Sequence, residues 1–348
     1  MQISLLNAAF ASKYNDFLNR CDCAMMYYSL SFKRLLEDVL ECKSHYLMAI
    51  NKDRICGILP LMLRGGKYGE VLNSLPFFGS NGGILADNDE SRNRLLEVYK
   101  EYSRDFASST YITNPLEDLI FQTYTKNTQI RYTPLLYDFI DSRIGQITPL
   151  LPEQELLKSF AASARRNIAK ALRSGVSVKL SQNFEFLYQT HFYNITSING
   201  IPKPKEFFKR LLKYCNDKEY KLYVAEFQGR AIAALLCFYC GNVVEYYTPA
   251  LLSEYRTLQA LPLIIFRAMN EAYDKGYKWW NFGGTWALQD GVYRFKSKFG
   301  TCDRIYYYYT LLNNKDILNS SKEELLAEYP YFYVLPFKCL GEKYGIRE

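Results

Sequence analysis

The stretch LYVAEFQGRAIAALLCFYCGN, residues 222–242, decides the fold that we predict for this chain. Two apolar runs flank a short polar turn that ends at Arg230, which is the pattern of a β-hairpin. A second stretch, YLMAINKDRICGILPLMLRGG at residues 46–66, has the same order, and its turn ends at Arg54. The sequence therefore predicts two hairpins of one kind, far apart in the chain.

The residues that follow each hairpin also match in order. Each half continues with a further strand and an irregular loop (68–87 and 242–256), a helix (89–106 and 258–277) and a short strand (110–115 and 278–284). Identity between the halves is slight, so only the order of elements supports a repeat. We predict an α/β (α+β) protein of two tandem domains, each with a mixed sheet flanked by helices.

The predicted domains are residues 1–150 and 151–312, followed by a helical and aromatic tail at 313–348. The join is expected within 141–154, where Gly145, Pro149 and Pro152 interrupt the periodic pattern. A length of 348 residues is consistent with two domains.

The composition is that of a globular protein, with 49% hydrophobic and 23% charged residues. A net charge of +7 favours an anionic partner without indicating nucleic acid, and we predict no DNA partner. Only His45 and His191 are available as histidine ligands, and Cys237 and Cys240 lie in an apolar strand, so we predict no metal site. The scattered cysteines favour reduced thiols in the cytoplasm.

Neither a membrane span nor a signal peptide is predicted. No apolar run approaches the ~18 residues of a spanning helix. The first residues, MQISLLNAAFASKYND, lack a basic region before their short apolar patch. We expect a cytoplasmic protein, with contact at the inner face of the membrane as a further expectation.

A basic helix is predicted at the start of the second half, within residues 153–180. Leu156, Phe160, Ile168 and Leu172 would form its apolar stripe, and Gly175 would end it. Its basic face would carry Arg166, Lys170 and Arg173. Two interpretations remain open: a solvated charged face, or an edge that binds an anion.

The stretch NFGGTWALQDGVYRFKSKFG, residues 281–300, carries the main functional signal. Gly283 and Gly284 would end a strand, and Asp290 would cap a short helix. Val292, Phe295 and Phe299 would then face the core, leaving Lys296 and the first-turn N–H groups for a phosphate or an oxyanion. The alternative is that the cations are merely solvated.

The segment DGVYRFKSKFG resembles the G-x-Y-x-F-K-x-x-F-G signature of the FemAB-like aminoacyl- and acyltransferases, which consist of two tandem GNAT-type domains. ARRNIAKALRSGVSV is similar to the basic helix that opens the second domain of that family. The segment 55–83 resembles the first domain of relatives linked to exopolysaccharide loci. Together these similarities cover residues 24–312.

The resemblance implies transfer of an acyl or aminoacyl group to an amine of a cell-envelope polysaccharide or peptidoglycan precursor, in a cleft formed largely by the second domain. It gives Lys296 an electrostatic role near the reacting centre or the donor phosphate, supported by Arg294 and Phe295 on the donor side. Glu245, Tyr246 and Tyr247 lie on the strand facing that cleft, and Tyr247 is the catalytic candidate among them. On the acceptor side, the candidates are Arg166, Lys170, Asn81, Gly82 and Gly83.

One departure concerns the donor. Residues 253–266 contain no glycine where acetyl-CoA-dependent GNAT domains place a glycine-rich pyrophosphate loop, although Arg256 remains to hold an anion. No helical arm of the kind associated with tRNA contact is inserted between residues 180 and 221. Both acyl-CoA and aminoacyl-tRNA therefore stay open as co-substrates, with no tightly bound cofactor expected.

The acceptor is expected to be a small-molecule or lipid-linked saccharide. The tail at 321–348 is predicted to pack across the domains, with membrane contact through Lys338 and Lys343 as the minor alternative. Two other functions remain: a non-catalytic protein that binds a saccharide or nucleotide sugar, and a CoA-dependent sugar N-acetyltransferase.

Overall fold

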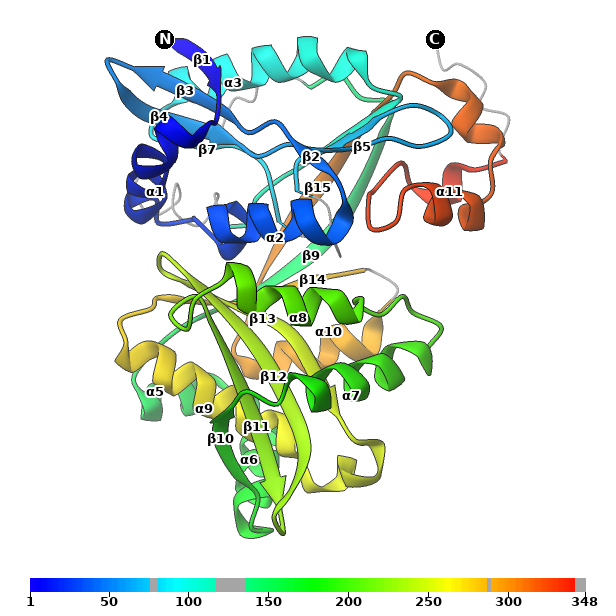
Figure 1. Ribbon diagram of the computed structural model, residues 1–348. Coiled ribbons are helices and arrows are strands. Elements are labelled where there is room, and N and C mark those ends of the chain that lie inside the picture. The colour runs from blue at the N-terminus through cyan, green and yellow to red at the C-terminus, as the bar shows by residue number, and fades with distance from the viewer. Residues whose placement is uncertain (76–80, 117–134, 287–288, 342–348) are drawn as a thin grey trace. The chain divides into compact units, whose positions relative to one another are not determined.

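The computed structural model describes residues 1–75, 81–116, 135–286 and 289–341 (Figure 1). The chain forms two compact units. Unit 1 comprises Met1–Cys23, Leu36–Arg143 and the chain from Ile305, and unit 2 comprises Ala24–Leu35 and Ile144–Arg304. These units differ from the predicted ranges: the division falls at Arg143, and each unit takes in a segment from the other half of the sequence.

Unit 2 contains a mixed sheet with the strand order β10-β11-β12-β13-β14-β9. Neighbouring strands are antiparallel except β13 and β14, which are parallel. The strands are β9 (Phe139–Pro149), β10 (Ser177–Ser181), β11 (Tyr220–Phe227), β12 (Arg230–Cys240), β13 (Val243–Leu251) and β14 (Trp279–Thr285).

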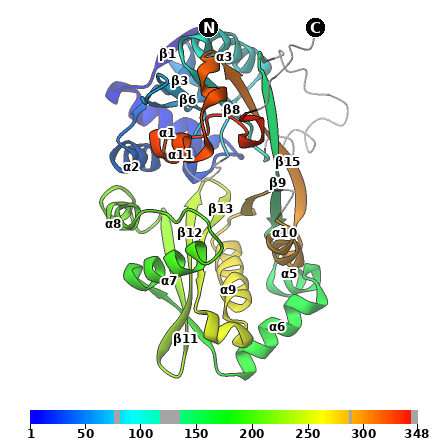
Figure 2. The ribbon, with the colours of Figure 1, turned by 90° about the vertical axis from the view of Figure 1, so that its right-hand side faces the viewer.

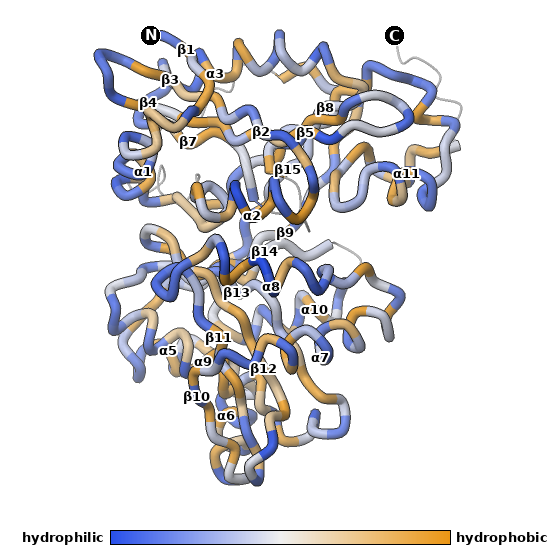
Figure 3. Tube along the Cα trace, in the orientation of Figure 1, coloured by the Kyte–Doolittle hydropathy of each residue, from blue (hydrophilic) through white to orange (hydrophobic). Residues whose placement is uncertain are grey.

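The predicted second hairpin is confirmed as β11 and β12. Its two turn residues, Gln228 and Gly229, have φ of 50° and 78°. Two successive left-handed residues form the turn whose twist matches that of paired strands. Hydrophobic residues run along these strands (Figure 3), and the core of unit 2 lies between them and helix α9 (Ala260–Asp274).

Helices cover both faces of this sheet. In Figure 2, α5 (Glu153–Ser159), α6 (Ala162–Arg173) and α9 lie on one side of β11–β13, and α7 (Phe184–Thr196) and α8 (Lys205–Tyr214) lie on the other. The short helix α10 (Asp290–Lys296) follows β14. The predicted helix at 258–277 thus corresponds to α9.

The single helix predicted from residue 153 is wrong, because the chain forms two helices with a break at Phe160. The backbone N–H of Ala161 donates to the carbonyl of Lys298 (2.9 Å). This break lets Phe160 pack edge-on against Phe299, at 5.3 Å between ring centroids. Leu172, predicted in the apolar stripe, is 46% exposed.

Unit 1 contains the four-stranded antiparallel order β1-β3-β4-β7 and the order β15-β8-β6-β5-β2. The first predicted hairpin is confirmed as β3 and β4, and helix α3 follows, with Asn88 accepting from the Ser91 N–H (2.9 Å). The elements are β1 (Gln2–Leu5), β2 (Lys43–Ser44), β3 (Leu47–Asn51), β4 (Arg54–Leu59), β5 (Met62–Arg64), β6 (Val71–Asn73), β7 (Leu85–Ala86), β8 (Ser108–Ile112), β15 (Cys302–Leu312), α1 (Ala11–Arg20), α2 (Leu30–Leu40), α3 (Asp89–Tyr102) and α11 (Lys322–Glu328).

The tail packs within unit 1, whereas the sequence predicted packing across the domains. The Tyr329 hydroxyl donates to the Gly69 carbonyl (2.9 Å), and Tyr333 donates its N–H to Asn73 (2.8 Å). Lys338 is exposed, and Lys343 lies outside the described residues. No helix in the described ranges is long and apolar enough to cross a membrane.

Candidate functional site

The parallel strands β13 and β14 pair over a short length and then part. Their register ends at Glu245 opposite Asn281. Beyond that point β14 continues beside β9, with Gly284 opposite Gly145. On its other side, β13 has a bulge at Tyr247, since Leu236 faces Thr248 and Cys237 faces Tyr246. The edge of β13 after Glu245 is therefore without a paired neighbour on the β14 side in the described chain.

Glu245 stands at the point where the strands part. Its side chain is 1% exposed. The Asn281 amide donates to Oε1 (3.1 Å), and the Tyr27 hydroxyl donates to Oε2 (3.3 Å). Burial raises the pKa of Glu245 to about 8, against the smaller lowering effect of these two hydrogen bonds. The carboxyl thus exchanges its proton near neutral pH, which a general base requires.

Lys296 is connected to Glu245 through the end of β14. Its ammonium, in a side chain 6% exposed, donates to the carbonyl of Gly284 (3.2 Å), to the hydroxyl of Thr285 (2.9 Å) and, more weakly, to the carbonyl of Gly283 (3.5 Å). The N–H of Gly283 donates to Asn281 Oδ1 (2.9 Å), which directs the amide nitrogen of Asn281 toward Glu245. Lys296 therefore fixes the backbone that orients the partner of the buried carboxyl.

The electrostatic state of Lys296 follows from its burial. Desolvation lowers the pKa of its ammonium to about 8. The Thr285 hydroxyl that it contacts donates in turn to Gln146 Oε1 (3.4 Å), and Gln146 donates to the carbonyl of Tyr293 (3.3 Å). The lysine of the sequence motif thus joins α10, β14 and β9.

The other residues of α10 and the turn after it differ in part from the roles that the sequence predicted for them. Asp290 is the first residue of α10 and pairs with Arg294 (2.8 Å), while the preceding Gln289 makes no side-chain cap. Val292 is 43% exposed, so its predicted core position is wrong. Phe295 packs on Phe299 (5.4 Å between centroids) at the edge of the core. Arg294 is exposed, including in its ion pair with Asp290.

Tyr247 occupies the bulge of β13 among aromatic rings. Its ring centroid lies 4.7 Å from that of Phe238 and 6.4 Å from that of Tyr27. Its hydroxyl is buried and has no hydrogen-bond partner in the described chain. Burial raises the pKa of Tyr247, so the phenol stays neutral and can donate a hydrogen bond or a proton.

A buried lysine lies beside this tyrosine. The ammonium of Lys203, on the loop between α7 and α8, is 4.6 Å from the Tyr247 ring centroid. Burial lowers its pKa to about 7. The backbone N–H of Lys203 donates to His191 Nε2 (3.2 Å), and burial followed by the Lys203 charge lowers the pKa of His191 to about 3. His191 is therefore neutral and serves as an acceptor.

The other predicted residues of unit 2 are not part of this cluster. Arg256 is exposed on the turn before α9, and its side chain makes no ion pair or hydrogen bond within the described residues. Gln259 adopts a left-handed conformation (φ 58°) at the start of α9, a position that usually favours glycine. Arg166 and Lys170 are exposed on α6, and within the described residues no hydrogen bond or ion pair joins them to Glu245 or Lys296.

Asn81, Gly82 and Gly83 belong to unit 1. Asn81 is 1% exposed and lies near Tyr306, whose pKa is raised mainly by burial. A Cβ at Gly82 would lie 2.0 Å from the carbonyl oxygen of Ser74, and Gly83 has φ +85°. Both glycines are therefore required by the local backbone, independently of any ligand.

We expect Gly82→Ala to destabilise the protein by about 1–3 kcal/mol, since the added methyl group displaces backbone. Gly291→Ala is the matched control, because a Cβ there meets nothing within 4 Å and alanine favours the helix. Chemical denaturation of both variants checks this. Equal stability of the two variants would contradict the close approach at Gly82.

The sequence analysis missed Tyr27, Asn281 and Lys203. Asn281 carried a signal, because it precedes the two glycines of the motif. Tyr27 carried none: it lies 218 residues from Glu245 in the chain. Within the described ranges, no group of three or more His, Cys, Asp or Glu side chains is placed to hold a metal ion.

Comparisons with known proteins show a domain match and a shared fold. Residues 158–297 match the family model described as an acetyltransferase (GNAT) domain. The sequence matches none of the curated proteins with which it was compared. The fold is similar to the crystal structure of FemX, with a TM-score of 0.68 and 14% identity over 91% of this chain and 98% of that one.

Two further solved structures share the fold at low identity. One, from Agrobacterium fabrum, is the "C-terminal Domain (DUF2156) of Putative Lysylphosphatidylglycerol Synthetase" (TM-score 0.51, 11% identity, covering 92% of this chain and 97% of that one). The other is a tandem GNAT protein from the clavulanic acid biosynthesis pathway (TM-score 0.50, 10% identity, covering 89% and 97%). The fold class expected from the sequence is confirmed. Residues 158–297 therefore form an acetyltransferase (GNAT) domain, within a chain whose fold is similar to that of FemX.

Proposed function

We propose that the protein transfers an acyl or aminoacyl group from acyl-CoA or aminoacyl-tRNA to an amine of a cell-envelope polysaccharide or peptidoglycan precursor, with Glu245 as general base. The observation that carries this proposal is the buried carboxyl of Glu245, held by Asn281 and Tyr27 where β13 and β14 part. With a pKa of about 8, the basic form of Glu245, which accepts the proton of an amine, is the minor form at pH 7 and the major form above pH 8.

In the proposed reaction, the acceptor nitrogen attacks the carbonyl carbon of the donor, and Glu245 takes the proton that the nitrogen loses. The bond from the carbonyl carbon to the donor's sulfur or ester oxygen then breaks. We assign Tyr247 as the hydrogen-bond donor to that leaving atom, because its phenol is neutral and its hydroxyl is unpartnered in the described chain. Lys296 acts as a positioning residue through Gly283 and Asn281.

The donor is assigned to the unpaired edge of β13 and the start of α9. Arg256, exposed just before α9, would hold an anionic part of the donor, and Arg294 and Phe295 remain donor-side candidates from the motif. On the acceptor side, Arg166 and Lys170 remain candidates from unit 2. The name of one similar structure mentions AcCoA and that of another mentions lysylphosphatidylglycerol, and the proposal keeps both donor classes.

Thermal unfolding with acetyl-CoA and longer acyl-CoAs separates the donors. A ligand at 100 times its Kd adds about 2.7 kcal/mol to the free energy of unfolding. A saturable rise in melting temperature, followed by thiol release with amino-sugar acceptors, would establish acyl-CoA as donor. If millimolar acyl-CoA has no effect, we expect transfer from charged tRNA. Failure of both donors with every amine acceptor would overturn the proposal.

A further inference from the structure

The end of α7 and the loop after it expose large apolar side chains. Phe192 is 39% exposed, Tyr193 70%, Ile198 69% and Ile201 49%. The described chain has sixteen exposed large hydrophobic residues, and four of them lie within these ten consecutive positions. Such clustering differs from the single exposed residues found on any surface. We call residues 192–201 the apolar tip.

The apolar tip lies in an uncharged stretch. No Asp, Glu, Lys or Arg occurs from residue 186 to residue 202. The histidine in this stretch, His191, is neutral because burial and the neighbouring Lys203 lower its pKa to about 3. The ring of Phe192 is adjacent to those of Tyr188 and Tyr193, at 6.0 Å between centroids in each case.

Several polar groups of the tip are paired within the chain. The N–H of Gly200 donates to the Ile195 carbonyl (2.9 Å), and the hydroxyl of Thr196 donates to the Phe192 carbonyl (2.7 Å). The Asn194 amide exchanges two hydrogen bonds with the backbone of Leu251, each 2.9 Å, which attaches the tip to β13. Because an unpaired polar group is costly in an apolar phase, these pairings lower the cost of placing the tip in the headgroup region of a bilayer.

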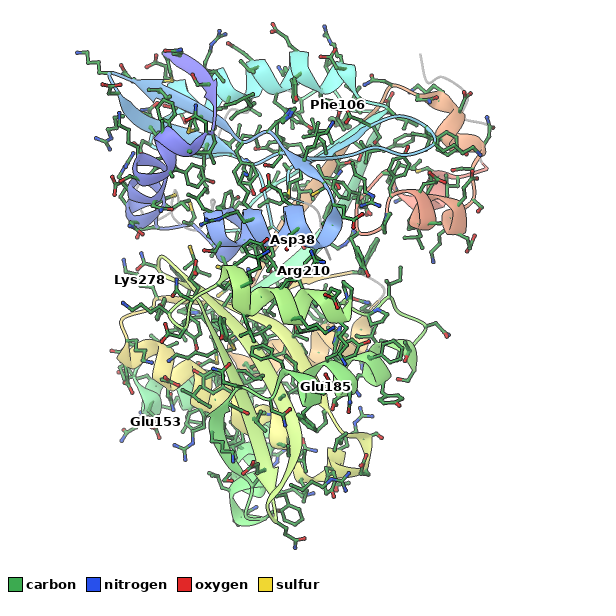
Figure 4. The ribbon with its side chains drawn as sticks, viewed as in Figure 1. Asp38, Phe106, Glu153, Glu185, Arg210 and Lys278 are labelled. Carbon is green, nitrogen blue, oxygen red and sulfur yellow. The ribbon has the colours of Figure 1, made fainter. Side chains whose placement is uncertain are left out.

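Basic side chains follow the tip on α8. Lys205, Lys209, Arg210 and Lys213 form this basic flank, with Glu206 as the acid among them. Their ion pairs with Glu185 and Glu206 are solvent-exposed, so these pairs are weak and screened by salt. Figure 4 labels Glu185 on α7 and Arg210 on α8, the two helices that carry the tip and the flank.

We propose that the apolar tip and the basic flank form a docking surface for a membrane with anionic headgroups. Aromatic and aliphatic side chains next to cations are the combination that binds at a bilayer interface, where apolar groups enter the headgroup region and cations pair with anionic lipid. Charge complementarity decides the occupant. This inference does not depend on the reaction proposed above.

Vesicle co-sedimentation of the full chain tests the proposal, with phosphatidylcholine–phosphatidylglycerol vesicles compared with pure phosphatidylcholine. We expect binding to the anionic vesicles that weakens as salt is raised. The double variant Tyr193→Ser/Ile198→Ser should bind about tenfold more weakly or worse, and Lys209→Gln/Lys213→Gln should lose most of the preference for anionic lipid.

The matched control is Leu172→Ser/Leu180→Ser. These leucines are 46% and 53% exposed in the same unit but lie on α6 and β10. The control should bind as the unchanged protein does, and melting temperatures should show that all variants are folded. An absence of binding to anionic vesicles, or an equal loss in the control, would overturn the proposal. Self-association that depends on Tyr193 and Ile198, without vesicle binding, would instead make the tip a protein interface.

Discussion

Replacing Glu245 by glutamine should reduce turnover by about 10²–10⁴-fold, because the variant keeps the shape of the side chain but cannot accept the proton of the attacking amine. The amide oxygen can still accept from Asn281, so the local geometry is retained. Steady-state kinetics with the donor identified by thermal unfolding measures the effect. Glu254→Gln, on the exposed turn before α9, is the matched control and should leave turnover unchanged.

The pH profile of the unchanged enzyme gives an independent test of the same assignment. Because the pKa of Glu245 is about 8, the fraction of this carboxyl in its basic form decreases tenfold for each pH unit below that value. We expect turnover to rise with pH and level off near pH 8, and Glu245→Gln should remove this limb. If Glu245→Gln is folded and retains full turnover, Glu245 has only a structural role.

Whereas turnover should rise with pH, the free energy of unfolding should fall as pH rises. The ordinary pKa of a glutamate is 4.5, and the folded value is about 8. Between these values the folded protein holds a proton that the unfolded chain has lost, so stability falls as pH rises and stays low above pH 8. Glu245→Gln should therefore be more stable than the unchanged protein by a few kcal/mol at pH 9, and nearly equal at pH 5. Urea unfolding at the two pH values measures this difference.

Replacing Lys296 by methionine should reduce turnover by about 10²-fold with little change in the KM for the acceptor. The variant removes the donor to the carbonyls of Gly283 and Gly284, so Asn281 is no longer held in place. The free energy of unfolding should change little, because the loss of these hydrogen bonds is offset by the removal of a buried charge. The control is Lys298→Met, because Lys298 lies just beyond α10 and its side chain makes no hydrogen bond or ion pair within the described residues.

A double-mutant cycle separates a positioning role from direct contact with the substrate. If Lys296 acts through Asn281, the effects of Lys296→Met and Asn281→Ala on turnover should not add. The apparent pKa seen in the pH profile should also rise in both variants, since the hydrogen bond from Asn281 lowers the pKa of Glu245. Additive effects with an unchanged pH profile would show that the ammonium of Lys296 acts on the donor directly.

Local patterns predicted the secondary structure well where the signal was strong. The hairpins formed by β3–β4 and by β11–β12 were read from two apolar runs and a polar turn. The helix at α9 followed from its apolar period. The prediction of one long helix from residue 153 was wrong, because a hydrogen bond to Lys298 and the packing of Phe160 on Phe299 break it, and both partners are distant in sequence.

The sequence by itself determined the two hairpins, the order of elements and the motif that contains Lys296, because these depend on residues close together in the chain. Only the tertiary structure decided what that motif does. Three hydrogen bonds, from Lys296 to Gly283, from Asn281 to Glu245 and from Tyr27 to Glu245, require separate elements of the chain to lie side by side. The raised pKa of Glu245 is likewise a consequence of burial, and burial depends on how the whole chain folds around one carboxyl.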